Sequence, residues 1–307
     1  MTHPYIDLTR LNPEYKGGAT RFAQGLANAL PEAVRLRKGE RPPRGATVIA
    51  PQCRVNFPEC KTILCIHDIQ HEVHPENFSF PVRHYRRWAY RRAARLAWSI
   101  QVSSYAIWRD LEKYIGVRPQ KLFFAPEGYD ERLWAPELPD RKPLGAPECN
   151  FVYYPAGLWK HKNHETVIRG LKNTNIKLVL TGKDYGEWPK IELLAARQNT
   201  QLFNLGTIPE IEMRWLYKNA ICTIAAGYYD SGPLPVKEAL ACGGNVLAAN
   251  IEPNRELNGL RNLSLFETFS PSSFAENLAI IPHGRGGWRS INEFRWSNIA
   301  DIYRQQL

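Results

Sequence analysis

Two carboxylates stand eight residues apart in the most informative segment of this sequence. Residues 227–244 read GYYDSGPLPVKEALACGG, with Asp230 in a glycine- and proline-rich loop and Glu238 inside the helix predicted to follow it. If the loop folds back across a ligand, both acids accept hydrogen bonds from its hydroxyl groups in one pocket. The first backbone amides of the helix have no partner within the helix and would bind phosphate. The pattern predicts a site for a ligand that carries hydroxyl and phosphate groups.

A basic turn follows the first predicted strand of the C-terminal half. Residues 154–171 read YPAGLWKHKNHETVIRGL, and Lys160, His161 and Lys162 form the turn between this strand and a predicted helix. A lysine fixed in a water-poor site stabilises negative charge on a phosphate-bearing ligand, so no metal ion is needed. A solvated cluster of surface charges is the alternative for Lys160 and His161. The sequence has no D-x-D pair at a strand end, and we expect no metal and no cofactor.

Glycines and histidines mark the N-terminal half. Gly17 and Gly18 follow the first predicted strand, and glycines there let backbone amides approach phosphate groups. His67, His71 and His74 cluster on a predicted loop after a buried strand. A lone histidine at a strand end is usually structural, but the clustering favours a functional one. The strand before His67 and the proline after His74 argue against a shared metal site, because both oppose the helix that would align the three rings.

Short apolar runs alternate with helical periodicity along the chain, which is typical of parallel β-sheets covered by helices on both faces. We therefore predict an α/β fold with two doubly wound sheets. The strands of the first sheet are predicted at residues 4–11, 46–51, 61–68, 98–104 and 121–128, and those of the second at 151–157, 177–182, 201–206, 221–227 and 244–250. Helices are predicted near residues 18–30, 83–97, 104–115, 163–173, 189–198, 209–219 and 234–242, with Ser104 as an N-cap.

A proline-rich stretch, residues 134–149, interrupts every periodicity and predicts a linker between two domains. We expect an N-terminal Rossmann-like domain at residues 1–133, the linker at 134–150, a C-terminal Rossmann-like domain at 151–285 and a closing helix at 286–307. Ligands of doubly wound sheets bind beyond the carboxyl ends of the strands. The chemistry is therefore expected in a central cleft between the two domains.

The segment 227–244 resembles the acidic motif E-G-F-G-L-P-x-x-E-A-x-x-C-G of GT-B glycosyltransferases, in the large retaining group 1 (family 4-like) that includes many mannosyl- and glucosyltransferases. Asp230 stands in the place of the first Glu, and Pro233 in that of the second Gly. The matching residues, with a local shift of one glycine, are Gly232, Leu234, Pro235, Glu238, Ala239, Cys242 and Gly243. The resemblance implies that Asp230 binds sugar hydroxyls and Glu238 the nucleotide ribose. Ser231, Gly232 and Leu234 are expected beside the donor.

Three further segments are similar to the same family. Lys162 matches a lysine that contacts the donor diphosphate, although the arginine that often precedes it near position 156 or 157 is missing. His67, in an HD dipeptide, matches a histidine that contacts the transferred sugar, and Gly17 and Gly18 match the first glycine-rich loop. Residues 125–137 are similar to the end of the family's N-terminal domain, so the resemblance runs from about residue 5 to 282. It implies His67, Lys162 and Asp230 as the catalytic residues.

The resemblance implies a GT-B enzyme that transfers a hexose or deoxyhexose, with retention and without metal, from a nucleotide-diphosphate sugar to a saccharide or lipid-linked acceptor. Cell-surface polysaccharide or glycan assembly is the expected context. Two alternatives stay open. One is a nucleotide-sugar 2-epimerase of the same architecture, which would need additional acids in the N-terminal domain. The other is a non-catalytic protein that binds nucleotide sugars or nucleic acid.

The net charge of +10 is concentrated in the N-terminal half, most densely in residues 83–98, RHYRRWAYRRAARLAW. The segment Arg83–Arg95 suits a phosphate-bearing partner, and we expect an anionic membrane surface rather than nucleic acid. The alternative is a solvated helix whose apolar side faces inward through Tyr85, Ala89, Ala93 and Leu96. The sequence has neither an apolar stretch of roughly 20 residues nor a signal-peptide pattern. We expect a cytoplasmic protein, peripheral at the inner face of the membrane if the arginines bind it.

Overall fold

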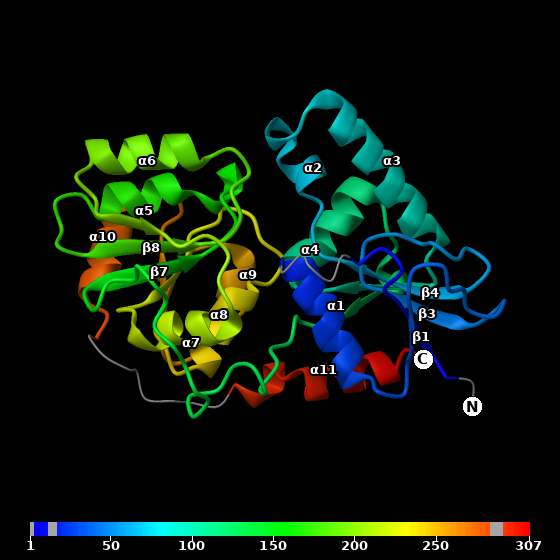
Figure 1. Ribbon diagram of the computed structural model, residues 1–307. Coiled ribbons are helices and arrows are strands. Elements are labelled where there is room, and N and C mark those ends of the chain that lie inside the picture. The colour runs from blue at the N-terminus through cyan, green and yellow to red at the C-terminus, as the bar shows by residue number, and fades with distance from the viewer. Residues whose placement is uncertain (1–2, 12–16, 283–290) are drawn as a thin grey trace. The chain divides into compact units, whose positions relative to one another are not determined.

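The chain forms two compact units, shown by the computed structural model of residues 3–11, 17–282 and 291–307 (Figure 1). The first unit combines the residues up to Gly128 with Asn292–Leu307, and the second unit is Tyr129–Ile291. Each unit is a six-stranded parallel sheet with helices on both faces, which confirms the predicted α/β fold class. The proline-rich residues 134–150 lie in the second unit.

The sheet of the first unit has the strand order β2-β1-β3-β4-β5-β6. Its strands are β1 (Tyr5–Asp7), β2 (Val34–Leu36), β3 (Thr47–Ala50), β4 (Lys61–Ile66), β5 (Ser99–Val102) and β6 (Leu122–Phe124). Its helices are α1 (Gly18–Ala29), α2 (Gln70–Val73), α3 (Phe80–Leu96), α4 (Tyr105–Asp110), which continues as a π-helical turn (Leu111–Ile115), and α11 (Trp296–Arg304). Short 3₁₀ turns are Pro75–Asn77, Pro119–Lys121 and Asn292–Phe294. The strand order reverses between β1 and β3, so the loops after these strands flank a topological switch point.

The sheet of the second unit has the strand order β12-β11-β10-β7-β8-β9. Its strands are β7 (Phe151–Pro155), β8 (Lys177–Thr181), β9 (Leu202–Asn204), β10 (Thr223–Ala225), β11 (Val246–Ala249) and β12 (Leu263–Phe266). Its helices are α5 (His164–Gly170), α6 (Trp188–Arg197), α7 (Glu210–Asn219), α8 (Leu234–Ala241), α9 (Glu252–Arg255) and α10 (Pro271–Ala279), with a 3₁₀ turn at Lys160–Lys162. The strand order reverses between β7 and β10, as in the Rossmann fold. The central strands are buried on both faces, which explains their continuous apolar sequences.

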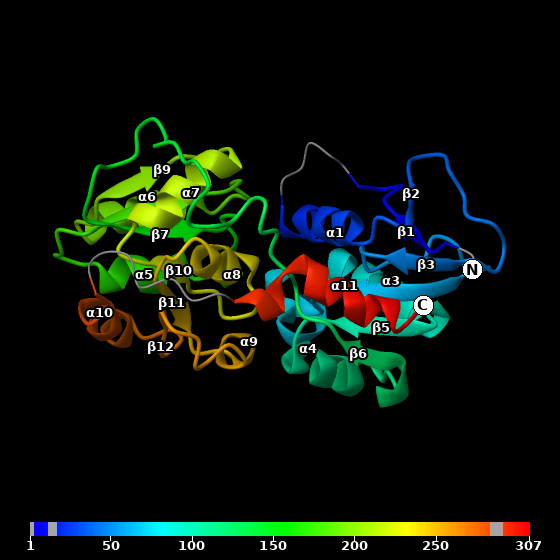
Figure 2. The ribbon, with the colours of Figure 1, turned by 90° about the horizontal axis from the view of Figure 1, so that it is seen from below.

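Helix α11 completes the core of the first unit beside α1, far from it in the sequence (Figure 2). Trp296 packs into a space that exists because Gly25 and Gly128 have no side chain. A Cβ atom on Gly25 would lie 2.1 Å from the Trp296 indole, and one on Gly128 would lie 2.6 Å from it. Tyr303 is also fully buried in this core. The first part of the predicted closing segment, residues 286–290, lies outside the described residues.

Helix α3 turns a different face inward from the one predicted. Ala93 is buried as expected, but Tyr85 and Leu96 are exposed, so the prediction was wrong for these two side chains. The cause is α2, which packs against α3 and offers polar partners. Glu72 of α2 is buried and forms an ion pair with Arg87 of α3, which must therefore face inward. The predicted N-cap of α4 is confirmed, since the Ser104 hydroxyl accepts a hydrogen bond from the Ile107 amide.

Candidate functional site

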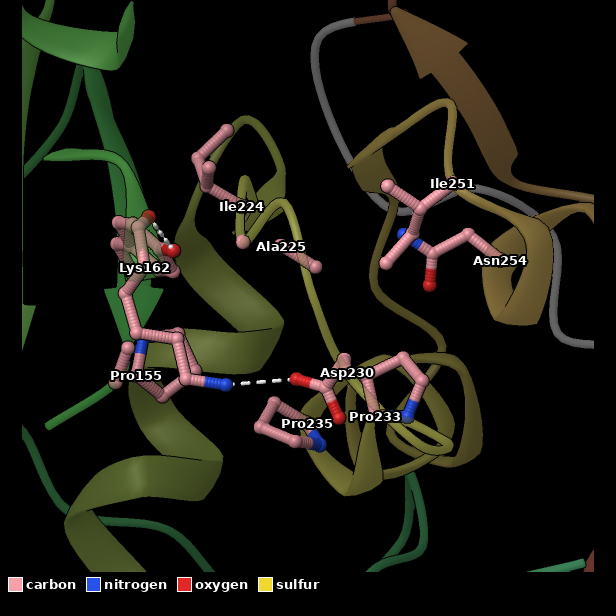
Figure 3. Close-up of a pocket in the computed structure, with 12 residues that line it drawn as sticks. Pro155, Lys162, Ile224, Ala225, Asp230, Pro233, Pro235, Ile251 and Asn254 are labelled. Carbon is pink, nitrogen blue, oxygen red and sulfur yellow. Dashed lines mark hydrogen bonds and ion pairs between the residues drawn. The ribbon is translucent and has the colours of Figure 1, made fainter. Parts of the chain in front are cut away.

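The ends of β7 and β10 bring Lys162 and Asp230 together where the strand order of the second unit reverses. Lys162 lies in the 3₁₀ turn after β7, and Asp230 lies in the loop after β10. The Lys162 Nζ atom donates a hydrogen bond of 2.7 Å to Asp230 Oδ2 (Figure 3). Their side chains are 23% and 24% exposed. Two of the three predicted catalytic residues therefore meet at the position where doubly wound sheets bind ligands.

Both oxygens of Asp230 accept hydrogen bonds. Oδ2 accepts from Lys162, and Oδ1 accepts from the amides of Ser231 at 2.9 Å and Gly232 at 3.5 Å. Burial by itself would raise the pKa of Asp230, but the Lys162 ammonium, the nearby His161 and the Ser231 amide hold this pKa below its usual value. The carboxylate thus occupies a set of N–H donors that would suit a phosphate group equally well.

The turn that carries Lys162 is anchored to the core. The hydroxyl of Tyr154, at the end of β7, donates a hydrogen bond to the Lys162 carbonyl. Asn163 ends the turn in the left-handed region, with a φ of 53°. The next residue, His164, is buried, and burial together with the charge of Lys162 lowers its pKa to about 3. His164 therefore adds no second positive charge behind Lys162.

A small cavity opens beside the ion pair. It has a volume of about 40 Å³, whereas pockets for small molecules measure roughly 300–1,000 Å³. The cavity therefore holds one small group of a ligand, and the rest of the ligand must lie over the strand ends. Besides Lys162 and Asp230, its lining consists of Tyr154, Pro155, Ala156, Ile224, Ala225, Gly227, Pro233, Pro235, Ile251 and Asn254.

One lining group has unused hydrogen-bonding capacity. The Asn254 side-chain amide donates to the carbonyl of Ala249 at 2.8 Å. Its Oδ1 atom is buried and accepts no hydrogen bond from the part of the chain that the structure describes. Because a buried acceptor without a donor costs free energy, a hydroxyl or amide group of a ligand in the cavity would find a partner in Asn254 (Figure 3).

Helix α8 begins just after the Asp230 loop but offers fewer amides than predicted. Pro233 and Pro235 flank its first residue, Leu234, and proline has no N–H group to donate. Glu238, one turn along, is 2% exposed, and its Oε2 atom accepts a hydrogen bond of 2.8 Å from the Tyr217 hydroxyl. The structure therefore places Asp230 on the cavity and Glu238 in the interior against α7.

An aromatic stack lies at the position of the missing arginine. Trp159, after β7, stacks on Tyr185, after β8, with ring centroids 3.7 Å apart and planes 16° apart. A Cβ atom on Gly157 would lie 3.1 Å from the Tyr185 ring and 3.3 Å from Trp159. A side chain at position 157 would therefore require the two stacked rings to shift by a few tenths of an ångström. The nearby cations on these loops are Lys160, which is exposed, and Lys183, whose Nζ atom lies 5.6 Å from the Tyr185 ring centroid.

In the first unit, His67 lies just after β4 in a closely packed setting. Its Nε2 atom donates a hydrogen bond of 2.8 Å to the carbonyl of Pro51, and its Nδ1 atom lies 3.6 Å from Oε1 of Glu127. The ring packs edge-on against Phe22 of α1, with centroids 4.4 Å apart. Glu127, in the loop after β6, is a residue that the sequence analysis missed. Only the family-like segment 125–137 pointed to this loop, and it drew attention to other positions.

The two glycines predicted at the donor stand at the start of α1. Gly17 is the N-cap residue, and its carbonyl accepts hydrogen bonds from the amides of Thr20 and Arg21. Among the described residues outside the local backbone, no atom lies within 4 Å of the place where a Cβ atom of Gly18 would be. A ligand can therefore approach the backbone closely here. Residues 12–16 of the same predicted loop lie outside the described residues.

The other two histidines of the cluster have separate surroundings. His71 is fully buried in α2 against Tyr90, and burial lowers its pKa to about 4. His74 is partly exposed, and its Nδ1 atom lies 3.1 Å from Oε1 of Glu76. Within residues 3–11, 17–282 and 291–307, no three His, Cys, Asp or Glu side chains lie together as a metal site would require.

Helix α3 presents arginines and aromatic rings on one exposed surface. Phe80, Tyr85 and Trp88 are 72%, 57% and 62% exposed. A surface hollow of about 430 Å³ is lined by Trp88, Arg91, Arg92, Arg95 and Leu96. We call these five residues the α3 surface. In the described ranges, no helix combines the length and apolar composition needed to span a bilayer.

Comparisons with known proteins find one matching family model and several similar solved structures. Residues 139–285 match the family model described as glycosyl transferases group 1. Similar solved structures include HepE from Anabaena in complex with UDP-glucose (TM-score 0.78, 16% identity, 99% of this chain and 99% of that chain). Sucrose-phosphate synthase from Thermosynechococcus elongatus is also similar (TM-score 0.77, 17% identity, 99% of both chains).

A third similar structure is WaaG, a glycosyltransferase involved in lipopolysaccharide biosynthesis (TM-score 0.68, 13% identity, 99% of this chain and 95% of that chain). At these identities the solved structures establish the fold alone, which confirms the predicted GT-B architecture. No curated protein matches the chain.

Proposed function

Because the second unit of this chain belongs to the glycosyl transferases group 1 family, we propose that the protein transfers a hexose or deoxyhexose from a nucleotide-diphosphate sugar to a saccharide or lipid-linked acceptor. Transfer proceeds with retention and without metal, in the assembly of a cell-surface polysaccharide or glycan. The observation that carries the proposal is the pairing of Lys162 with Asp230 at the switch point of the second sheet. UDP-sugars are the first donors to test, because HepE is described in complex with UDP-glucose.

The pair suits the chemistry of the proposed transfer. As the glycosidic bond of the donor breaks, negative charge develops on the leaving diphosphate, and the Lys162 ammonium stabilises it without a metal ion. Asp230, as an anionic acceptor, holds hydroxyl groups of the sugar. Lys162 has one partner in Asp230 and two further N–H bonds available to phosphate oxygens. A retaining reaction needs a base for the acceptor hydroxyl, and the leaving diphosphate itself supplies it.

The first test is a panel of UDP-, GDP-, ADP- and dTDP-sugars, with binding and slow hydrolysis measured by calorimetry and NMR, with EDTA and then with Mg²⁺. One donor is expected to bind and hydrolyse equally in both conditions, and the Lys162→Ala variant is expected to lose about 10²-fold in turnover. Lys160→Ala is the matched control, because Lys160 lies two residues away, is exposed and does not line the cavity. Equal losses in both lysine variants, or binding of no nucleotide sugar, would refute the donor site.

The role of Glu238 needs a conservative variant, because this carboxylate is buried against Tyr217. Glu238→Gln keeps the volume and removes the charge that the ribose hydroxyls would meet. Tyr217→Phe is its control, since it removes the hydrogen bond and leaves the carboxylate. Weaker binding of the donor in Glu238→Gln alone supports ribose binding. Equal weakening in both variants assigns Glu238 to the packing of α8 against α7.

Glu127 gives specific support to the alternative activity, a nucleotide-sugar 2-epimerase. It is a buried carboxylate of the first unit, 3.6 Å from His67, and this activity needs an acid in that unit. The two activities differ without an acceptor present. A transferase slowly hydrolyses the donor, whereas an epimerase converts it to a second sugar nucleotide and exchanges a ring proton with D₂O. NMR of the donor in D₂O separates them.

We also propose that the α3 surface binds the anionic inner face of a membrane, where a lipid-linked acceptor would be found. Arginines attract acidic headgroups, and aromatic rings insert at the boundary between headgroups and acyl chains. Trp88 and Arg92 show this combination, with the guanidinium carbon 6.0 Å from the ring centroid. Arg87 takes no part, because it pairs with the buried Glu72.

Sedimentation with phosphatidylglycerol vesicles tests the membrane proposal. The double variant Arg92→Gln/Arg95→Gln is expected to bind about 30-fold more weakly, since each basic residue near the surface contributes about 1 kcal/mol. Trp88→Ala is expected to weaken binding as well. The control is Arg41→Gln/Arg44→Gln, which removes the same charge from another exposed part of the first unit. Binding that depends only on total charge, or no binding to anionic vesicles, would contradict a specific α3 surface.

A further inference from the structure

We propose that Glu127 is a positioning residue for His67, holding its imidazole as a doubly protonated hydrogen-bond donor, so that His67 acts in the transfer as a fixed positive charge and not as a base. The inference rests on the proposed function, because it assumes that the protein catalyses a transfer. The coupling between the two side chains can be tested without it.

The contacts of His67 determine its tautomer. The Pro51 carbonyl can only accept, so the Nε2 atom 2.8 Å away must carry a proton. The Nδ1 atom then faces Oε1 of Glu127 at 3.6 Å. A neutral ring would direct its lone pair at this carboxylate, which is unfavourable, whereas an imidazolium directs an N–H group at it. The geometry therefore favours the charged ring.

The surroundings of His67 agree with a charged ring. Burial by itself would lower the pKa of His67, but Glu127, the Pro51 carbonyl and the nearby Asp68 together hold this pKa above its usual value. Two further described neighbours of His67 carry no charge. Phe22 of α1 packs against it, and Cys53, in the loop after β3, lies nearby with a pKa raised to about 11 by burial, so its thiol stays uncharged.

Glu127 is itself held in place from two sides. The loop that carries it begins at Ala125, whose carbonyl accepts a 2.6 Å hydrogen bond from the buried Gln101 side chain of β5. It ends at Gly128, over which Trp296 of α11 packs. The Glu127 side chain is 8% exposed. A carboxylate fixed so deeply is a rigid partner that orients a histidine, as carboxylates orient catalytic histidines elsewhere.

The distance of 3.6 Å between His67 Nδ1 and Glu127 Oε1 allows the Nδ1–H group to contact a ligand as well. This distance is longer than a hydrogen bond between charged groups, which measures about 2.7–2.9 Å. The Nδ1–H group is therefore attracted by Glu127 and can also donate a hydrogen bond to a ligand. The His67 side chain as a whole is 15% exposed. An oxygen of a bound sugar can share the proton, and the ring gives hydrogen bonds while accepting none.

The sign of the pH dependence follows from this state. A His67 pKa above the usual value means that the charged form persists to higher pH, and that it is lost as the pH rises through the raised pKa. Catalysis by a charged donor declines over that range. Catalysis by a base would instead increase over it, so the two roles of His67 predict opposite slopes.

The first test needs no substrate. The full chain, labelled with ¹³C at histidine Cε1, is titrated by NMR from pH 5 to 9, and the His67 signal is assigned with His67→Gln. We expect a pKa above 6.5 in the unmodified protein and a value lower by about one pH unit or more in Glu127→Gln. Asp68→Asn is the charge-matched control and is expected to give a smaller change. A His67 pKa that does not change in Glu127→Gln overturns the positioning role.

The second test is the pH profile of donor hydrolysis, with UDP-glucose as the probe. In the unmodified protein kcat should fall as the pH rises through the His67 pKa measured by NMR, and in Glu127→Gln the fall should begin at lower pH. The KM for UDP-glucose should change less than kcat, because the proposed role of His67 is in the transfer step and not in holding the diphosphate. A kcat that rises through this pKa would show that His67 is a base. An NMR coupling without turnover of any nucleotide sugar would refute the proposed transfer and leave the coupling intact.

Discussion

The Asp230 carboxylate stands where an anionic ligand would bind. It accepts from the Lys162 ammonium at one oxygen and from the Ser231 amide at the other, and a phosphate group would seek the same donors. Binding of a diphosphate must therefore displace Asp230 from Lys162 or share Lys162 with it. The like charges of the two anions then oppose binding, and Asp230 becomes free to accept hydrogen bonds from sugar hydroxyls.

Replacing Asp230 should consequently separate binding from turnover. Asp230→Asn is expected to bind the free nucleoside diphosphate about tenfold more tightly, equivalent to about 1.4 kcal/mol, because Lys162 no longer has an anionic partner. The same variant should lose about 10²-fold in turnover, since the sugar loses a charged acceptor. Calorimetry with UDP and NMR of donor hydrolysis measure the two effects.

The control for this prediction is Asp184→Asn. Asp184 follows the neighbouring strand β8 and accepts hydrogen bonds from the amides of Gly186, Glu187 and Trp188, with no contact to Lys162. It should leave UDP binding within about twofold of the unmodified protein, since it is exposed to solvent and its charge is screened. Weaker UDP binding in Asp230→Asn would mean that Asp230 orients Lys162 instead of competing with the ligand.

Local sequence patterns pointed to some of the residues that lie together at the candidate site and missed others, for a physical reason. Lys162 and Asp230 each follow a strand, and parallel topology brings strand ends together. Glu127 also follows a strand, but its contact with His67 depends on how β4 and β6 are placed on either side of β5, which local periodicity does not encode. The burial of Glu238 against Tyr217 depends in the same way on how α7 and α8 pack.

Among the strands, β2 and β12 escaped prediction. Strand β2 has three residues, Val34–Leu36, one of them an arginine, and gains its stability by pairing with β1. Strand β12 was also missed, because Leu263–Phe266 includes a serine and lies at the sheet edge. The long buried strands β4 and β7 were predicted closely, since burial on both faces imposes a continuous apolar sequence. Helix α3 was located correctly, but the prediction of its inward face was wrong, because the ion pair of Arg87 with the buried Glu72 of α2 overrides the hydrophobic periodicity of the helix.

Helix α11 can pack in the first unit because Gly25 and Gly128 leave space for Trp296. Gly128→Ala is expected to destabilise this unit by about 1–3 kcal/mol, the usual cost of overpacking a core, because the new methyl group would overlap the Trp296 indole. The measurement is thermal unfolding followed by near-ultraviolet circular dichroism. Gly18→Ala is the control, since a Cβ atom there would meet no side chain of the described residues within 4 Å.

A second variant checks the cause. In Gly128→Ala/Trp296→Leu the smaller side chain makes room for the methyl group, so the two changes should destabilise by less than the sum of their separate effects. Strict additivity would show that the methyl group and the indole do not compete for the same space.

At the scale of the whole molecule, the first unit is built from two separate parts of the chain. Deletion of residues 296–307 removes Trp296, Ile299 and Tyr303 from the core that contains Phe22 and Leu26. One buried aromatic side chain alone is worth about 3–5 kcal/mol, so the first unit should unfold while the second stays folded. Hydrogen exchange should show fast exchange in β3 and β4 and continued protection in β7 and β8. Equal loss of protection in both units would show that they unfold together.

The discontinuity of the first unit also sets an order of events on the ribosome. The second unit, Tyr129–Ile291, is continuous in the sequence and has all of its strands before the indole of Trp296 is made. The first unit is synthesised earlier, but its core is incomplete until α11 is made. Until then the apolar groove beside Gly25 and Phe22, which Trp296 fills in the folded protein, stays exposed. The usual sequence of domain folding, N-terminal first, is therefore reversed here. The nascent chain exposes an apolar groove throughout the synthesis of the second unit, and this groove is the place where a chaperone would bind.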